Sequence, residues 1–414
     1  MADKMPKTIM LLGLLALTSL AASIEAKGHF DAATTEFAAK LYQEIAKTTD
    51  DSKNIFFSPL SIFTAFGMLK AGARGKTEKQ MEQVMNWDQL KSEEGHSGIQ
   101  NLLRDVFAPL SAENTISVAN KVWMQKYFCL ETCQKFVKVL EDKYSAALEE
   151  LNFAGKPEDS RKAINKWIED KTNRKIKDLM PPGSVLSDTR FVLTNAIYFK
   201  SKWKSQFNKN NTADRSFHAL GKNGVVKKQV PVMYQNGRFF SSGFMPTAPY
   251  QLLEMPYENS ELSMVVILPR SAQEMKKIET TNQPLRLYEN IMEELYEFPE
   301  TGLDVFLPKF KIASDLKLKN YLINMGMKDV FSQRKADLSG ITGFRGLHVN
   351  AAVHKAYVNV DEEGTEAAAA TGIGITLTSL PFQFKVDKPF FFMIKHKKSG
   401  VILFMGRVMD PTAE

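Results

Sequence analysis

The sequence predicts an α+β fold in which helices and strands do not alternate regularly. Amphipathic helix-type segments occupy most of the first 180 residues, whereas apolar strand-type segments dominate the remainder. A doubly wound parallel sheet would instead require the two kinds of segment to alternate along the chain. The chain has 414 residues, of which 44% are hydrophobic, so we expect it to bury a large core.

The helix-type segments have apolar side chains three and four residues apart, which gathers these side chains on one face. They comprise residues 29–49, 54–73, 76–87, 96–110 and 159–180. In the first of them the apolar face consists of Phe30, Phe37, Ala38, Leu41 and Ile45. Ser58-Pro59 marks a helix start. The last segment is expected to be one long helix whose inner side carries Ala163, Ile164 and Trp167.

The strand-type segments are short apolar runs rich in β-branched and aromatic residues. They comprise residues 191–200, 250–257, 262–269, 303–312 and 400–409. Because they follow one another without intervening long helices, they complete the α+β pattern.

The N-terminus is typical of a secretory signal peptide. Two lysines precede an apolar run over residues 9–23, and small residues follow it. The run is short for a transmembrane helix. We therefore expect residues 1–26 to be a signal peptide, cleaved after Ser23 or Ala26, and the mature protein to be secreted into the extracellular space, with no membrane partner.

Several functional classes are disfavoured by what the sequence lacks. The six histidines form no HExxH or other paired-ligand spacing, so we expect no metal site. No GxSxG or GxxxxGK[ST] motif occurs, so we expect no catalytic residues, no cofactor and no enzyme activity. The net charge of +7 indicates a solvated basic surface. The basic stretches lack interleaved aromatic residues, which disfavours a nucleic-acid partner.

The only two cysteines, Cys129 and Cys133, are too few to hold a secreted protein together. Within a continuous helical turn they would be poorly placed for a bridge, so two reduced, packed cysteines are the favoured interpretation. A bridge across a loop-to-helix junction remains open. The sequon Asn210-Asn211-Thr212 lies in a polar setting that suits a glycosylated surface loop, at Asn210.

Residues 361–378, "DEEGTEAAAATGIGITLT", fit two periodicities at once. The alanines favour a helix. Every second residue from Thr365 is nevertheless uncharged and grows from small to large and apolar, ending at Ile375 and Leu377. Over thirteen residues this is the alternation of a half-buried strand. A segment that tolerates two conformations is a candidate switch.

The chain resembles the serpins, the serine protease inhibitor superfamily, over roughly residues 28–410. "DEEGTEAAAATG" is similar to the family's hinge, and "FKVDKPFFFMIKH" with "GVILFMGRVMDP" to its C-terminal signature. "NIFFSPLSI", "NAIYFKSKWKSQF" and "ADLSGI" resemble other family blocks in the expected order. The resemblance implies a single domain over residues 27–414, with about nine helices, three β-sheets and a reactive-centre loop at about residues 362–382.

The resemblance also implies a mechanism. A serine protease cleaves the loop and forms an acyl-enzyme, and insertion of residues 365–377 into the central sheet traps this complex. The hinge would comprise Glu362, Glu363, Gly364, Thr365, Glu366, Ala367, Ala368, Ala369 and Ala370. Thr365 is uncharged and small enough to enter the sheet, whereas a charged side chain there would be buried without a partner. We therefore expect an inhibitory member.

The family spacing places the reactive bond between Thr378 and Ser379, with Leu377 and Leu380 beside it. No Lys or Arg occurs between Asp361 and Phe384, which disfavours trypsin-like targets. Elastase-like or subtilisin-like proteases suit Thr378. If the register shifts by one or two residues, either leucine would favour a chymotrypsin-like enzyme.

Further positions carry over from the family. Glu362 is expected to pair with Lys309, above Trp203, at the point where the loop inserts, the breach. Four residues are expected to form a polar cluster midway along the sheet, the shutter: Ser58, Ser61, Asn195 and His354. The helix that binds heparin in some relatives has one arginine here, Arg104, and no lysine, so glycosaminoglycan binding is a weak alternative. The expected partner is an extracellular serine protease, bound by a monomer.

Two alternatives remain open. A non-inhibitory serpin would act as a carrier or chaperone, against which the hinge chemistry argues. A substrate-type serpin would be cleaved without trapping, and the pliable loop glycines Gly372 and Gly374 leave this open.

Overall fold

A computed structural model describes residues 7–90, 92–107, 115–129, 131, 133–221, 224–258, 261–365 and 382–413. Three sheets and ten α-helices are present in this part of the chain. The predicted α+β class and the three sheets are confirmed, and the count exceeds the expected nine helices by one.

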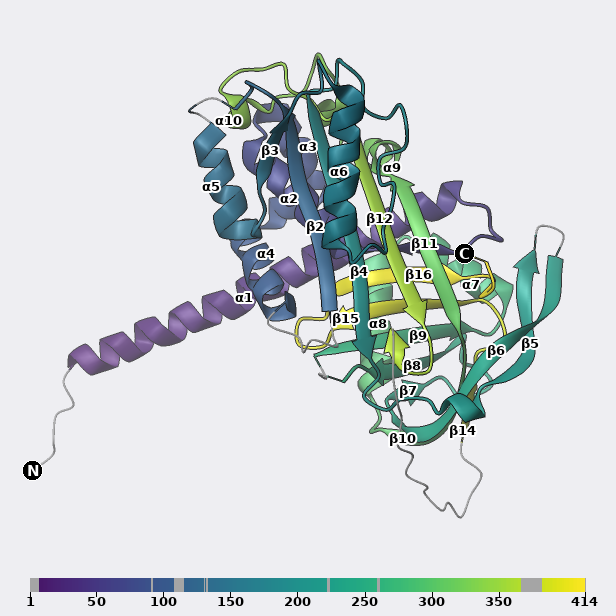
Figure 1. The fold of residues 1–414 in the computed structure, drawn as a ribbon. Helices are drawn as coiled ribbons and strands as arrows, with labels where there is room; N and C mark the ends of the chain where they lie inside the picture. The colour runs from purple at the N-terminus through teal and green to yellow at the C-terminus, as the bar shows by residue number, and fades with distance from the viewer. Residues whose placement is uncertain are drawn as a thin grey trace, which may run out of the picture.

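The central sheet runs the length of the molecule (Figure 1). Its strand order is β11 (Phe310–Lys317), β12 (Ala351–Val360), β4 (Phe191–Lys202), β2 (Thr115–Gln125) and β3 (Leu148–Leu151). β12 and β4 are directly paired and parallel. A short strand, β13 (Gly364–Thr365), pairs with the end of β4.

Two further sheets pack below and behind the central one. The six-stranded sheet has the order β1 (Ile55–Phe57), β16 (Ile402–Val408), β15 (Phe390–His396), β9 (Leu262–Pro269), β8 (Tyr250–Pro256) and β7 (Ser241–Ser242). The four-stranded sheet has the order β14 (Phe382–Lys385), β10 (Thr301–Pro308), β6 (Gly224–Phe239) and β5 (Ala213–Gly221). Every residue of β9 and β15 is buried, in keeping with their largely apolar sequences; the polar exceptions Ser263, Lys395 and His396 are buried as well.

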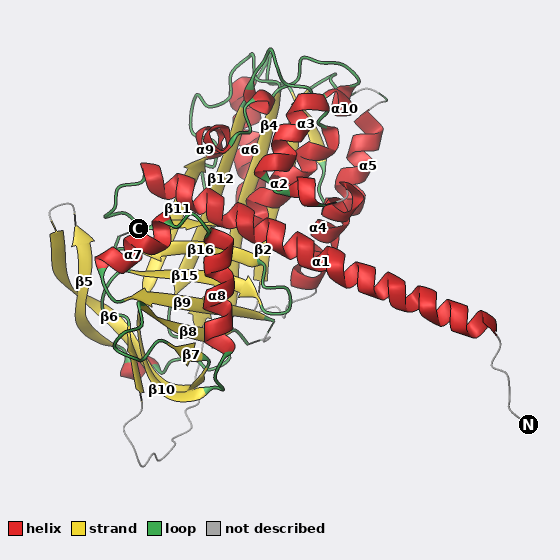
Figure 2. Cartoon of the chain, turned by 180° about the vertical axis from the view of Figure 1, so that it is seen from behind, coloured by secondary structure: helices red, strands yellow, loops and turns green. Residues whose placement is uncertain are grey.

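The helices cover the sheets on several sides. They are α1 (Lys7–Thr48), α2 (Pro59–Gly72), α3 (Gly75–Val84), α4 (Ser92–Phe107), α5 (Cys133–Tyr144), α6 (Pro157–Lys171), α7 (Ala272–Thr280), α8 (Pro284–Tyr296), α9 (Leu318–Met325) and α10 (Ser339–Thr342). α6 lies on the front of the central sheet in Figure 1. Figure 2, seen from the opposite side, shows α1 and α2 over the other face of this sheet and α7 and α8 over the six-stranded sheet.

Local signals locate the apolar face of α1 and the start of α2, although α1 begins at Lys7, before the expected residue 29. All five predicted face residues of α1 are buried: Phe30, Phe37, Ala38, Leu41 and Ile45. The side chain of Ser58 caps α2 by accepting a hydrogen bond from the Ser61 amide, and Pro59 occupies the first helical position.

The expected helix over residues 159–180 is wrong in its extent. α6 ends at Lys171, because Asn173 and Arg174 have left-handed φ values of 49° and 58°. Ala163 is exposed rather than inward-facing, whereas Ile164 is fully buried against the sheet and Trp167 is partly buried.

The expected strand over residues 303–312 is instead two strands in different sheets. β10 belongs to the four-stranded sheet and β11 to the central sheet. Pro308 has no amide hydrogen to continue the ladder, and the amide of Lys309 donates to the Pro231 carbonyl at 2.9 Å. Lys309 therefore lies at the joint between two sheets.

The two cysteines are bonded, which corrects the favoured interpretation of a reduced pair. The Cα atoms of Cys129 and Cys133 are 5.2 Å apart. Cys129 lies in a loop and Cys133 is the first residue of α5. The bridge therefore spans a loop-to-helix junction, and the objection to a bridge within one helical turn does not apply.

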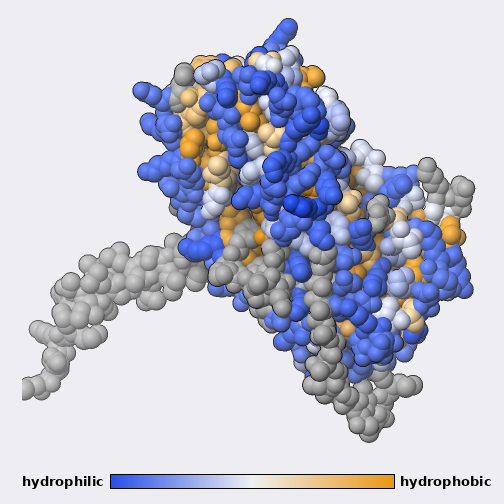
Figure 3. Space-filling view, viewed as in Figure 1, coloured by the Kyte–Doolittle hydropathy of each residue, from blue (hydrophilic) through white to orange (hydrophobic). Residues whose placement is uncertain are grey.

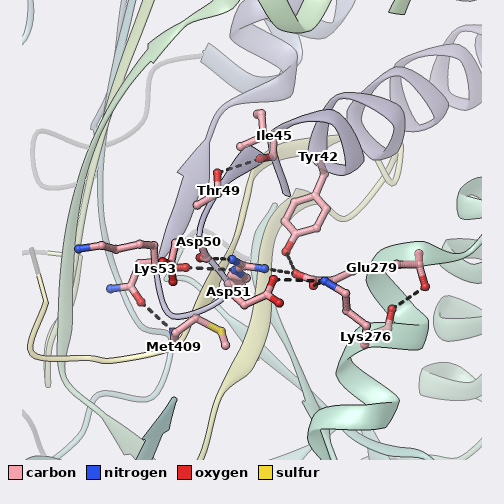
Figure 4. A network of polar contacts seen from close by, with 12 residues as sticks. Tyr42, Ile45, Thr49, Asp50, Asp51, Lys53, Lys276, Glu279 and Met409 are labelled. Carbon is pink, nitrogen blue, oxygen red and sulfur yellow. Dashed lines mark hydrogen bonds and ion pairs between the residues drawn. The ribbon is translucent and has the colours of Figure 1, made fainter. Parts of the chain in front are cut away.

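A buried polar network joins α1, α7 and β16 (Figure 4). The guanidinium of Arg407, 1% exposed, donates to Glu279 at 2.6 Å and to the carbonyls of Asp50 and Lys53 at 2.9 and 3.1 Å. Tyr42 donates to the same Glu279 carboxylate at 2.8 Å. The ion pair thus joins β16 to α7, and the Tyr42 hydrogen bond adds α1 to the same carboxylate.

The beginning of α1 projects away from the rest of the chain in Figure 1. Among the described residues, no helix has the length and apolar character needed to span a bilayer. On the face shown in Figure 3 the surface is largely hydrophilic, with small separate hydrophobic patches.

Candidate functional site

The candidate site begins where β12 ends. After Val360 the chain turns through residues 361–364, and the Asp361 amide donates to the Gly364 carbonyl at 3.0 Å. Gly364 has a φ of 135°, and a Cβ atom there would lie 2.2 Å from the Ser201 carbonyl oxygen. Only glycine therefore fits this turn.

The turn directs the chain back along the central sheet. Gly364 and Thr365 form β13, which pairs antiparallel with Lys202 and Ser201 at the end of β4. Two residues of the hinge thus already occupy positions of a strand between β4 and β12.

Next to β13 the central sheet is open. The parallel pairing of β12 with β4 runs from Ala351 opposite Val192 to Tyr357 opposite Tyr198 and stops there. A cavity of about 540 Å³ lies beyond this point, lined by Lys200, Lys209, Lys309, Asn359, Asp361, Glu362 and Glu363. Polar and charged residues therefore surround the place where β4 and β12 diverge.

Two ion pairs hold the hinge at this cavity. Lys309 donates to one oxygen of Glu362 at 2.8 Å, and Thr212 donates to the other oxygen at 2.8 Å. Lys209 pairs with Glu363. Burial raises the pKa of Glu362, but the hydrogen bonds from Lys309 and Thr212 outweigh burial and lower this pKa below its ordinary value.

The structure thus brings together Glu362 and Lys309, which the sequence paired. It adds Lys209 and Thr212, which the sequence missed as site residues. Thr212 is 150 residues from Glu362, and both new residues belong to the stretch noted only for its glycosylation sequon. No local signal pointed from there to the hinge.

Trp203 lies directly under the hinge turn. It is 1% exposed, and its ring stacks on Tyr257 with centroids 4.6 Å apart. Its indole N–H donates to the Asp361 carbonyl at 3.0 Å, and its amide donates to the Glu363 carbonyl at 2.9 Å. The tryptophan therefore fixes the backbone of the turn at two points.

The four residues expected at the middle of the sheet lie in one buried cluster. The Ser58 amide donates to Nε2 of His354 at 3.1 Å, and Nδ1 of His354 bonds to Oδ1 of Asn195. Asn195 Nδ2 donates to the Ser61 carbonyl at 2.9 Å and also to Asn120, which the sequence did not single out. Since Nε2 accepts, Nδ1 carries the proton of a neutral ring.

This cluster crosses three neighbouring strands. His354 on β12 is paired with Asn195 on β4, which is paired with Asn120 on β2. Burial lowers the pKa of His354 to about 3, which keeps the imidazole neutral. The bond between His354 and Asn195 spans the two strands that must separate if another strand is to enter.

The rest of the expected site lies outside the described residues. This applies to Glu366 and Ala367–Ala370 of the hinge, to the reactive bond Thr378-Ser379 and to the neighbouring Leu377 and Leu380. Among the described residues, no group of three or more His, Cys, Asp or Glu side chains could hold a metal ion.

Residues 32–411 match the family model described as "Serpin (serine protease inhibitor)". The chain belongs to the serpin family. Human Serpin B13 is 38% identical to this serpin over 397 residues, which cover 92% of this chain and 99% of that protein. Leukocyte elastase inhibitor of Xenopus laevis is 36% identical to this serpin over 388 residues, which cover 92% of this chain and 100% of that protein.

The solved structure of uncleaved ovalbumin has the same fold as this serpin. Its TM-score is 0.83 at 30% sequence identity, and the match covers 92% of this chain and all of that one. The family description is that of an inhibitor rather than an enzyme. The relatives' names give no support to the expected secretion, which stays a prediction.

Proposed function

We propose that this serpin inhibits serine proteases by inserting its cleaved loop into the central sheet. The observation that carries the proposal is β13: Gly364 and Thr365 already pair with Lys202 and Ser201, at the open end of the gap between β4 and β12. Insertion would then extend an existing strand rather than nucleate a new one.

Continuing this register gives residues 366–375 a partner on β4. Ala367 would lie opposite Phe199, Ala369 opposite Ile197 and Ile375 opposite Phe191. Opposed residues of an antiparallel pair point to the same face, and these β4 side chains belong to the main core. The uncharged alternation predicted from the sequence would therefore face that core.

In the same register Thr371 would lie opposite Asn195. Insertion parts Asn195 from His354, which leaves two buried polar groups in need of new partners. The hydroxyl of Thr371 can donate to one and accept from the other. We infer that it replaces the lost bond.

The other set of loop residues would face α6. Gly372 and Gly374 would lie opposite Thr194 and Val192, on the side of the sheet that α6 covers. Trp123 donates to Thr194 there at 2.9 Å, and Val192 is part of the second core cluster. The glycines thus gain a role, because they would add no bulk beneath a packed helix.

The target is inferred to be an elastase-like or subtilisin-like protease. Thr378 offers a small side chain to the protease pocket, and a relative of this serpin is named leukocyte elastase inhibitor. The expected reactive bond remains Thr378-Ser379.

The test mixes the protein with elastase-, subtilisin- and chymotrypsin-type proteases. We expect a covalent complex that survives SDS, with cleavage at Thr378-Ser379. Thr365→Arg should yield cleaved protein without complex, because insertion would bury an unpaired charge; Thr365→Ser is the matched control and should trap normally. Cleavage of the wild type without any complex would favour a substrate-type serpin. Resistance to all three proteases would favour a non-inhibitory serpin that acts as a carrier.

We also propose that the mature protein is a secreted monomer, glycosylated at Asn210. The bonded Cys129–Cys133 pair is typical of an oxidising compartment, and Asn210 is exposed. Expression of the full chain in a secretory eukaryotic host should give a protein that begins at residue 24 or 27 and loses mass with a glycosidase. An unprocessed N-terminus would contradict this.

A further inference from the structure

An exposed apolar patch lies where the reactive loop re-enters the fold. The rings of Phe244 and Phe382 stack with centroids 5.1 Å apart. Phe382, at the start of β14, is 57% exposed, and the neighbouring Met245 is 71% exposed. We call Phe244, Met245 and Phe382 the prime-side patch, because Phe382 follows the expected reactive bond along the chain. Contiguous exposed apolar side chains are often found at interaction sites.

The loop that carries two of the three patch residues, Phe244 and Met245, is held by several hydrogen bonds. Arg270, which follows β9, donates to the carbonyls of Gly243, Met245 and Ala248 at 2.9, 2.7 and 2.7 Å. Gly243 has a φ of 77°, and a Cβ atom there would lie 2.2 Å from a backbone oxygen of Tyr250. A tight, clamped turn thus presents Met245 to solvent.

The core does not account for this arrangement, because Met245 and Phe382 remain mostly exposed. A loop whose backbone is already ordered loses less entropy when a partner covers it. Rigid aromatic residues are also common among the residues that dominate binding energy. The clamp therefore favours a binding role.

The position of the patch identifies the partner. Phe382 is three residues beyond Ser379, so an extended chain places the patch within about 10 Å of the expected reactive bond. A standard protein interface covers about 800 Å² per partner, a disc of roughly 16 Å radius. A protease bound at that bond would cover the patch. In Figure 1, β14, which begins at Phe382, and the neighbouring β7 and β10 lie together at one end of the molecule.

We propose that the prime-side patch is a second contact surface for the target protease. It would bind an apolar surface beside the protease's active-site cleft, on the side that accepts residues after the cleaved bond. This inference rests on the proposed inhibitory function, and it makes Met245 and Phe382 specificity-determining residues outside the bait Thr378.

The test compares Met245→Ser and Phe382→Ser with Leu186→Ser. Leu186 is 57% exposed and precedes β4, so it lies beyond the far end of a strand roughly 36 Å long at about 3.3 Å per residue. An elastase-type protease whose catalytic serine is replaced by alanine measures reversible binding, and the active protease measures the rate of complex formation. Thermal unfolding verifies that each variant folds.

We expect each patch variant to bind the inactive protease about tenfold more weakly and to be trapped about tenfold more slowly. Leu186→Ser should stay within twofold of the wild type. Arg270→Lys, which keeps the charge but not the three-carbonyl clamp, should weaken binding although Met245 is intact.

The outcomes separate this proposal from the proposed function. If both patch variants bind and are trapped like the wild type, the patch is not a contact surface for the protease, and the inhibitory function is unaffected. Cleavage without complex formation, with binding still dependent on the patch, would overturn inhibition and keep the patch. Patch-dependent self-association in sedimentation, with unchanged protease binding, would overturn the proposal in favour of a second copy of the chain as partner.

Discussion

Glu362 shows how one side chain can hold the hinge. Its carboxylate, 6% exposed, accepts from Lys309 and Thr212. Since the pKa of Glu362 is lowered, its ionised form stabilises the fold above its ordinary pKa of 4.5, and this stabilisation is lost as the pH falls below that value.

We expect the Glu362–Lys309 pair to contribute measurably to stability. In a double-mutant cycle with Glu362→Gln and Lys309→Met, the coupling in the free energy of unfolding should be about 1 kcal/mol. Lys166 and Asp170 form the control pair, because both are exposed and should couple by less than about 0.5 kcal/mol. Equal coupling in both cycles, measured with urea, would contradict this role.

His354 predicts a pH dependence of stability. Its folded pKa is about 3 and its ordinary value 6.5, so between these pH values only the unfolded chain binds this proton. The free energy of unfolding should therefore fall as the pH falls, by up to about 1.4 kcal/mol per pH unit. Burial also lowers the pKa of His96, to about 4, which adds an effect of the same sign.

Substitution of His354 separates the two histidines. The dependence of unfolding free energy on pH between 5.5 and 4 should be less steep in His354→Gln than in the wild type, by up to about 1.4 kcal/mol per pH unit. Urea unfolding at several pH values measures this difference. Parallel pH profiles would show that His354 is protonated when folded.

At the scale of elements, the Arg407–Glu279 pair joins α1, α7 and β16 (Figure 4). Glu279→Ala should lower the free energy of unfolding by about 3–5 kcal/mol, because it leaves Arg407 buried without its counter-charge. Adding Arg407→Met should recover part of the loss.

Lys276→Ala provides the control for this prediction. Lys276 pairs with Asp51 at 3.2 Å and lies 3.9 Å from the same Glu279 carboxylate. Both Lys276 and Asp51 are more than half exposed, so removal of the Lys276 charge should cost less than about 1 kcal/mol. Thermal or urea unfolding distinguishes the cases. A double variant less stable than Glu279→Ala would contradict the buried-charge explanation.

Some elements follow from local sequence, whereas others depend on tertiary contacts. The start of α2 follows from Ser58-Pro59 alone, since the cap and the proline act within one turn. The division between β10 and β11 could not be predicted, because both are apolar strands and only their partners place them in different sheets. The end of α6 likewise depends on two left-handed residues that are not glycines.

The same distinction applies to the site. Glu362, Lys309 and the cluster around His354 could be identified by resemblance to a family, because they lie in its motifs. Asn120, Lys209 and Thr212 could not, since each contributes a contact that exists only once distant strands and loops have met. The disulfide was only the less favoured alternative, because no local signal shows that α5 begins at Cys133 and leaves Cys129 in the preceding loop.

The whole molecule holds its central sheet in an uninserted state, with β4 and β12 paired over seven residues and β13 beside them. Cleavage of the loop should allow residues 366–377 to extend β13, which adds ladder hydrogen bonds and buries apolar side chains. Unfolding entropy is about 2.1 cal/mol/K per residue, or about 0.8 kcal/mol/K for a chain of this size. Each 1 kcal/mol gained should therefore raise Tm by about 1.2 °C.

We expect cleavage within the loop to raise Tm by more than about 6 °C, equivalent to a net gain of about 5 kcal/mol. Scanning calorimetry of intact and cleaved protein measures the shift. Thr365→Arg, cleaved at the same bond, should show no rise in Tm. Insertion would bury the unpaired charge of the arginine, so the cleaved loop should stay outside the sheet. If cleaved wild type and cleaved Thr365→Arg unfold at the same temperature as the intact protein, β13 is not the beginning of an inserting strand.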